Sequence, residues 1–394
     1  MTAISAELAL AAACCRRAAS AQRDAAVISA ADAGIDWSRF ARVLARHRIT
    51  ALALDGLRQA GVAPPEPVAN RLKSIAIRET HRSLAMAAET AQLQKACDAA
   101  GLPCAFVKGA TLAALAYGDA GIKKSHDIDL LTTPQAAVAV RALLEGRGYR
   151  MTLPADLDAE RFRVLIDHHK EAAFVHGVTG HMVDLHWRLL DQAWVLPGVD
   201  VADAVRTVGL GGVAVRTLPD PALFAYLCVH GAAHAWNRLK WSADLNAFLS
   251  HQSAQTIEAL HVTAVAMGAG RAPTMGLILC QRLYGLTVSP TLAQRLKRDR
   301  IAQALADNAL ACLNHGQGAV ELPLPYSLPV VRIKLAQLFL MPGAGHLKRE
   351  LARRMNSPDD RINLGLPPAL SFLYLPLRVP LWLMRHGRAL IGRR

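Results

Sequence analysis

The sequence has no CxxC pair: its seven cysteines are odd in number and scattered along 394 residues. Neither a zinc site nor a disulfide framework is therefore expected. Reduced thiols are typical of a cytosolic protein. The stretch from Leu10 to Cys14 is similar to a lipoprotein cleavage site, but no lysine or arginine precedes it and its apolar run is short. We therefore expect an amphipathic helix there and no signal peptide.

Aromatic residues are also scarce, at 5% of the chain. The sequence shows no recognisable RNA-binding module and no basic surface rich in aromatics, so a nucleic-acid partner is not indicated. An uninterrupted hydrophobic run that could cross a bilayer is missing too. The most apolar segment, 366–384, contains four prolines and Arg378, which argues against a spanning helix.

The composition nevertheless allows a large core, because hydrophobic residues make up 52% and charged residues 19% of the chain. Lys and Arg exceed Asp and Glu by 45 to 31, a net charge of +14 that favours an anionic partner. The segment 332–394 holds 12 basic and 3 acidic residues, which is +9 of this excess. This tail either wraps the protein as a last helical layer, which we favour, or rests on an anionic membrane surface.

The periodicity predicts an α+β fold: a minimal mixed sheet of roughly four strands with helices on it, flanked by helical regions on both sides. We expect helices over 1–100, the longest from 67 to 100, and the sheet over 101–217. A second helical region over 218–330 would close the cleft, and the basic apolar tail follows over 331–394. Strands are predicted at 104–109 and 126–131, a helix at 134–149, and a hairpin around the turn 178–180.

The clearest chemical signal is the segment HDIDLL, in which Asp127 and Asp129 lie two residues apart on a predicted strand. Alternate residues of a strand share a face, so both carboxylates project together while Ile128 and Leu130 enter the core. Two carboxylates this close repel each other unless a cation lies between them. Mg²⁺ holding a triphosphate is the usual solution, whereas surface ion pairing with nearby lysines is the plain alternative.

A third carboxylate comes from the segment MVDLHWRL. Val183, Leu185 and Trp187 form an apolar face, so Asp184 and His186 share the opposite one. We predict that Asp184 is the third metal ligand and helps to deprotonate the acceptor hydroxyl, since an unpaired acid on a sheet face is otherwise costly.

A phosphate-binding turn is predicted upstream, where a strand ending in Lys108 and Gly109 leads directly into a helix that starts at Ala110. Glycine lets backbone N–H groups approach a phosphate, and a helix N-terminus favours an anion. Lys124 adds positive charge nearby. Lys108 is equally consistent with a solvated residue at the end of the strand.

These segments together resemble the uncharacterised nucleotidyltransferase family of the polymerase-beta-like superfamily, over about residues 100–250. The resemblance matches Gly109 to the superfamily's turn, Asp127 and Asp129 to its metal pair, and Asp184 to its third carboxylate. It implies a Mg²⁺-dependent enzyme (Mn²⁺ could substitute) that uses a nucleoside triphosphate (NTP) as substrate. Ala110 departs from the pattern, because the superfamily often has Ser or Gly there.

The acceptor stays open: a protein, a small molecule or a polymer. One alternative function is a nucleotide-binding regulator or antitoxin-like partner with little turnover, and another is nucleotide addition to RNA 3′ ends. We expect a cytoplasmic protein, peripheral to the inner membrane if the tail binds it. His230 and His234 have the i,i+4 spacing of a zinc pair but lack the metalloprotease Glu, so we favour packing against the catalytic region over metal ligation.

Overall fold

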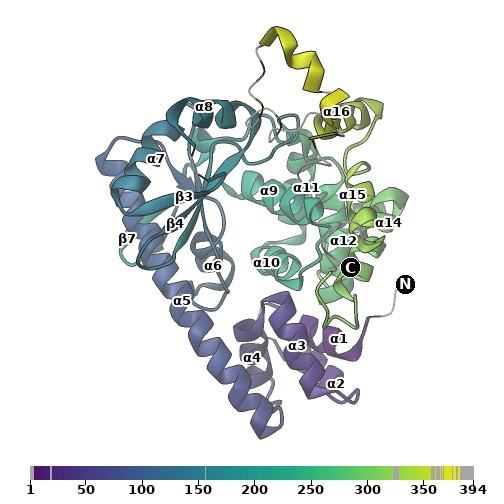
Figure 1. Cartoon of the computed structure of the whole chain (residues 1–394). Coiled ribbons are helices and arrows are strands. Elements are labelled where there is room, and N and C mark those ends of the chain that lie inside the picture. The colour runs from purple at the N-terminus through teal and green to yellow at the C-terminus, as the bar shows by residue number, and fades with distance from the viewer. Residues whose placement is uncertain are drawn as a thin grey trace, which may run out of the picture.

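The computed structural model describes residues 4–381, apart from 18–19, 156, 323–327, 356–359, 361–363, 365, 367, 375 and 379. In Figure 1 the N-terminal helices lie at the bottom, the sheet at the left, and the later helices at the right. The predicted α+β architecture is confirmed, with one five-stranded mixed sheet, one small antiparallel sheet and helices around them.

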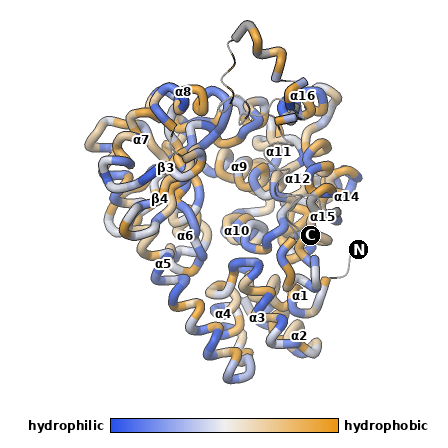
Figure 2. The backbone as a smooth tube through the Cα atoms, in the orientation of Figure 1, coloured by the Kyte–Doolittle hydropathy of each residue, from blue (hydrophilic) through white to orange (hydrophobic). Residues whose placement is uncertain are grey.

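Four short helices begin the chain, and several start at a serine or aspartate whose side chain accepts a hydrogen bond from the first turn, as Ser5, Ser20 and Asp36 do. They are α1 (Ala6–Cys14), α2 (Ala21–Ala31), α3 (Trp37–His47) and α4 (Thr50–Gln59). The long helix α5 (Glu66–Ala99) follows, as predicted, and runs from this bundle along the sheet (Figure 1). Hydrophobic and hydrophilic turns alternate along it (Figure 2), as suits a helix that packs only in part.

The main sheet has the strand order β1-β2-β5-β4-β3. Its strands are β1 (Ala105–Phe106), β2 (Ile128–Leu131), β3 (Tyr149–Leu153), β4 (Glu171–His176) and β5 (Met182–His186). Between them run α6 (Ala110–Tyr117), α7 (Ala137–Gly146) and α8 (Ala159–His168). β2 pairs with β5 in parallel and the other pairs are antiparallel. The predicted hairpin is β4–β5.

A second hairpin, β6 (Arg206–Leu210) with β7 (Val213–Thr217), follows the single turn η1 (Val201–Asp203). Its two-residue turn is Gly211-Gly212, and both residues have positive φ, as a tight turn between twisted strands requires. The Arg216 backbone N–H donates to the Gln94 side chain at 3.0 Å, which ties this hairpin to α5.

The later helices form the second half of the molecule. They are α9 (Asp220–Ala233), α10 (Leu239–Leu249), α11 (Ala254–Ala264), η2 (Val265–Ala269), α12 (Ala272–Tyr284), α13 (Pro290–Arg298), α14 (Arg300–Leu313), α15 (Leu328–Gln337), α16 (Ala344–Met355) and η3 (Pro368–Leu373). One continuous apolar core joins α9, α10 and α12 with α1 and α3. The first and last thirds of the chain are therefore packed together.

Two sequence-based expectations on the sheet were wrong. The helix predicted over 134–149 ends at Gly146, and a strand absent from the prediction, β3, begins at Tyr149, because Gly148 adopts a φ of +89° and the Tyr149 side chain is buried. The strand predicted from residue 126 begins at Ile128, so Asp127 lies just before it. The hairpin β6–β7 was also not foreseen.

The basic tail contacts the rest of the protein through α15 and α16. The Gln192 side chain donates to Glu350 at 3.4 Å, and the Trp194 indole donates to His346 at 3.0 Å. Part of the apolar segment 366–384 lies outside the described residues. Within the described part of the chain, the helices are all too short or too polar to cross a membrane.

Gly56 of α4 offers a test of the N-terminal packing. A Cβ at this position would lie 2.3 Å from the backbone oxygen of Cys14 in α1, and backbone cannot move aside cheaply. We expect Gly56→Ala to lower the free energy of unfolding by roughly 1–3 kcal/mol and the melting temperature accordingly. Gly146→Ala is the matched control, because its Cβ would meet open space in a helix and stability should stay equal or rise by up to about 1 kcal/mol. Equal melting of both variants would contradict this packing.

Candidate active site

A cavity of about 240 Å³ lies where the sheet meets α9 and α10. Its walls come from the end of α3, the turn before α6, the strands β2, β4 and β5, and both helices. The charged, histidine and aromatic groups that line it are Arg48, Lys108, Lys123, Lys124, His126, Asp127, Asp129, Lys170, Glu171, Asp184, His186, His230, His234, Lys240, Trp241 and Asp244. Acidic and basic side chains therefore line the same cavity.

The pairing of β2 with β5 determines the centre of this cavity. Asp129 and Asp184 are direct neighbours in the parallel register. Ile128, Leu130 and Val183 alternate with them and are buried in the core, so the predicted alternation is confirmed for these strands. The two carboxylates therefore project side by side toward the cavity.

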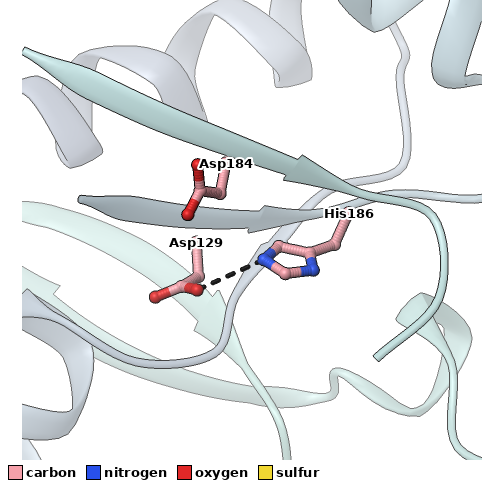
Figure 3. A group of neighbouring side chains, drawn as sticks. All are labelled: Asp129, Asp184 and His186. Carbon is pink, nitrogen blue, oxygen red and sulfur yellow. Dashed lines mark hydrogen bonds and ion pairs between the residues drawn. The ribbon is translucent and has the colours of Figure 1, made fainter. Parts of the chain in front are cut away.

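His186 completes a group of three with Asp129 and Asp184. One ligand atom from each residue lies within 4.8 Å of the others, and Figure 3 shows Asp184 and His186 on one strand facing Asp129 on the next. Nε2 of His186 is 3.2 Å from Oδ1 of Asp129. Two carboxylates and an imidazole are ligands that a divalent cation accepts, so these residues could hold a metal ion.

Glu171 on β4 lies beside the second ring nitrogen of His186. The two residues are register partners, and Nδ1 of His186 is 3.0 Å from Oε2 of Glu171. This is an ion-pair distance, but the geometry is not that of a hydrogen bond, and Nδ1 has no hydrogen-bond partner among the described residues. Burial raises the pKa of Glu171, but the neighbouring His186 and Lys170 bring it below its ordinary value. Sequence reasoning placed His186 on this face yet missed it as a ligand, and it missed Glu171 altogether.

Lys108 is buried against the same cluster, with Nζ 2.8 Å from Oδ1 of Asp129 and 5.8 Å from the ring centre of Tyr226. Burial lowers the pKa of Lys108, but the Asp129 carboxylate raises it further, so the pKa lies well above its ordinary value. Burial likewise raises the pKa of Asp129, while Lys108 and His186 bring it well below its usual range. Lys108 is therefore a charged partner of the cluster, not a solvated residue.

The environment of Asp184 shifts its pKa in the direction opposite to that of Asp129. Burial, followed by the charges of Asp129 and Asp127, raises its pKa to about 7. Among the described residues, no lysine, arginine or histidine lies within 4.0 Å of it as an ion-pair partner. A bound cation would supply the missing counter-charge, and this is the observation that fits a metal ion to the site.

The turn at Gly109 has the conformation that the sequence suggested. Gly109 adopts φ 63° and ψ −126°, open to glycine but not to other residues, and a Cβ there would lie 3.0 Å from Oγ of Ser125. It opens α6 and lines the cavity. The Ala110 side chain is buried in the core, so that residue can offer a ligand only its backbone.

The other predicted residues lie at the cavity's edges. Asp127 lines the cavity but is not among the three clustered groups, and its part in metal binding stays a prediction. Lys124 also lines it, with Nζ paired to Glu79 at 2.7 Å. The i,i+4 spacing of Lys240 and Asp244 on α10 predicts an ion pair between them. Instead, Asp244 pairs with Lys123 at 3.3 Å and accepts a hydrogen bond from Tyr117 at 3.0 Å.

His230 and His234 stack in the cavity wall with Trp241. The two imidazole centres are 4.9 Å apart, and His234 stacks on the Trp241 ring at 5.0 Å. Burial, then Lys108, lowers the pKa of both, to about 4 for His234, so both are neutral near pH 7. Trp241 packs against the core and also lines the cavity, whereas Trp236 is fully buried.

Known sequences place this site in a family. The sequence model described as an uncharacterised nucleotidyltransferase matches residues 33–285, which is more than half of the chain and includes every wall of the cavity. No curated protein matches the chain. The chain therefore belongs to the uncharacterised nucleotidyltransferase family.

The pKa of Asp184 predicts how stability depends on pH. Its folded-state pKa of about 7 exceeds the ordinary 3.8, so the unfolded chain releases this proton first and the metal-free protein loses stability as pH rises from about 4 to 7, by at most roughly 4 kcal/mol. Mg²⁺ should therefore raise the melting temperature more at pH 8 than at pH 5. In calorimetric scans of Asp184→Asn, the stability of the metal-free protein and the Mg²⁺-induced rise in melting temperature should both vary less with pH. Equal Mg²⁺ shifts at the two pH values would contradict this.

Gly109→Ala tests the turn. The backbone strain should cost roughly 1–3 kcal/mol, and displacement of the turn should weaken nucleotide binding by about tenfold or more. Gly118→Ala, at the other end of α6, is the control: its φ of 71° and ψ of 3° are accessible to other residues, and a Cβ would meet nothing within 4 Å. Both variants should lose stability, but only Gly109→Ala should lose nucleotide affinity in a titration. An unchanged affinity would remove the turn from the binding site.

Proposed function

We propose that this protein transfers a nucleoside monophosphate from an NTP to a hydroxyl of a protein, small molecule or polymer, and releases pyrophosphate. The observation that carries the proposal is the juxtaposition of Asp129, Asp184 and His186 beside the Gly109 turn in a member of a nucleotidyltransferase family. The reaction forms a bond from the acceptor oxygen to the α-phosphorus. It breaks the bond between that phosphorus and the bridging oxygen, whose electron pair leaves with pyrophosphate.

Asp129, Asp184 and His186 would hold Mg²⁺ or Mn²⁺, with Asp127 contributing from the loop before β2. The bound ion would supply positive charge to neutralise the phosphates and the attacking oxygen. A carboxylate oxygen of Asp184, which lies beside Asp129 in the cavity, takes the acceptor's proton. Glu171 places a negative charge beside Nδ1 of His186.

Lys108 and Gly109 prepare the phosphate side of the site. The Lys108 ammonium, buried beside Asp129, balances the charge of the cluster and stands next to the incoming phosphates. Gly109 lets the chain turn closely enough for backbone N–H groups at the start of α6 to face them. Lys124 adds charge at the rim.

A second candidate is a nucleotide-binding regulator with little turnover, and two observations favour it. Lys108 already neutralises Asp129 directly, at 2.8 Å. Ala110 buries its methyl group in the core, so the turn has no hydroxyl there for a phosphate. Binding of NTP without transfer would establish this function.

Label transfer from α-labelled NTPs tests the proposal. Purified wild-type protein with Mg²⁺ or Mn²⁺, in lysate of the source cells, should place label on an acceptor. Asp129→Asn and Asp184→Asn should each reduce transfer by at least about a hundredfold, because each removes a charged group from the reacting centre. Glu160→Gln, which removes one exposed charge from α8, should leave it unchanged. Transfer that survives both aspartate substitutions would refute the assignment, and binding without transfer would favour the regulator.

A further inference from the structure

Two cations of the cavity, Arg48 and Lys240, have no carboxylate partner. Neither forms an ion pair within 4.0 Å with any residue that the structure describes. The remaining lysines of the cavity are all paired: Lys108 with Asp129, Lys123 with Asp244, Lys124 with Glu79, and Lys170 with Glu171. Arg48 and Lys240 are thus the cations left over for a ligand.

Arg48 occupies a position where its backbone is strained. It ends α3 in the left-handed conformation, at φ 58° and ψ 44°, where its N–H closes the helix on Leu44 and Ala45. Glycine is the usual residue at such a helix end. The chain instead carries an arginine there, and that arginine lines the cavity. A strained residue kept at a cavity wall points to a role for its side chain.

Lys240 is confined on the other wall, at the start of α10. Its Nζ lies 5.9 Å from the ring centre of Trp241. Burial, and then the charge of Lys123, lowers its pKa to about 7. A buried ammonium without an anion is costly, so an anionic ligand in the cavity would stabilise this arrangement.

Asp127 lines the same cavity as Asp184, Arg48 and Lys240. Asp129, Glu171 and Asp184 project from the strands. Arg48 and Lys240 lie at the end of α3 and the start of α10. An elongated anion with a metal ion at one end fits this division of charge.

We propose that Arg48 and Lys240 bind the terminal phosphates of the NTP, and the pyrophosphate that leaves. This rests on the proposed function. Arg48 can grip two phosphate oxygens with its planar guanidinium, and Lys240 adds a point charge. The N-terminal helices would thereby complete the nucleotide site, and the protein would bind triphosphates in preference to monophosphates.

Titration calorimetry with Mg²⁺ and either NTP, inorganic pyrophosphate or the corresponding nucleoside monophosphate tests this subsite. Arg48→Gln and Lys240→Gln should each weaken binding of NTP and pyrophosphate by about 10- to 100-fold, the usual effect of losing a charge-assisted hydrogen bond. Affinity for the monophosphate should change less than about twofold. Arg42→Gln on α3 and Lys95→Gln on α5, both exposed, should bind as the wild type does.

Arg48→Gly separates a binding role from a structural one. Glycine relieves the left-handed backbone, so this variant should melt at an equal or higher temperature while still losing affinity for pyrophosphate. Arg48→Lys should recover part of the affinity. Wild-type affinity in Arg48→Gly and Lys240→Gln would overturn the subsite alone, whereas a wild-type protein that binds neither NTP nor pyrophosphate would overturn the proposed function itself.

Discussion

The parallel pairing of β2 with β5 brings Asp129, which is buried, next to Asp184, which is half-buried, in one cavity. Two carboxylates in such surroundings repel each other strongly. Lys108 and His186 both lie within ion-pair distance of Asp129, whereas Asp184 has no such partner among the residues that the structure describes. Asp129 is therefore charged in the free protein, whereas a bound ligand would supply the counter-charge of Asp184.

The surrounding elements maintain this imbalance. Glu171 lies beside His186 on the next strand. Tyr117 and Lys123 both contact Asp244, which anchors α10 against α6 and the loop before β2. These buried contacts join the sheet to the helices that form the opposite wall. The cavity is consequently a junction of several parts of the chain, and its charges depend on how those parts dock.

Two residues with an unusual backbone conformation lie in the cavity wall. Gly109 and Arg48 both adopt positive φ, and both line the cavity. At Gly109 the sequence supplies the one residue that tolerates the turn without penalty. At Arg48 the sequence has a residue that is strained in this conformation, so the side chain that lines the cavity is present at a cost in stability. A trade of this kind is expected at binding sites more than in a structural core.

The sequence by itself determined the features that depend on local periodicity. The two-residue repeat of a strand places Asp129 opposite Ile128 and Leu130, and Asp184 beside His186, because alternate side chains share a face. The long helix α5, the glycine turn before α6 and the β4–β5 hairpin follow from similarly local signals. Boundaries were less certain: Gly148 ends α7 early, and Asp127 falls before β2.

Only the tertiary structure decided which distant residues share the cavity. In the sequence, Arg48 precedes all the strands and Lys240 follows them. No periodicity links a helix end near the N-terminus to the start of α10. Glu171 likewise becomes a partner of His186 only through strand register. Such contacts arise from the packing of whole elements against each other, so their charges can be assigned to one site only after the chain has folded.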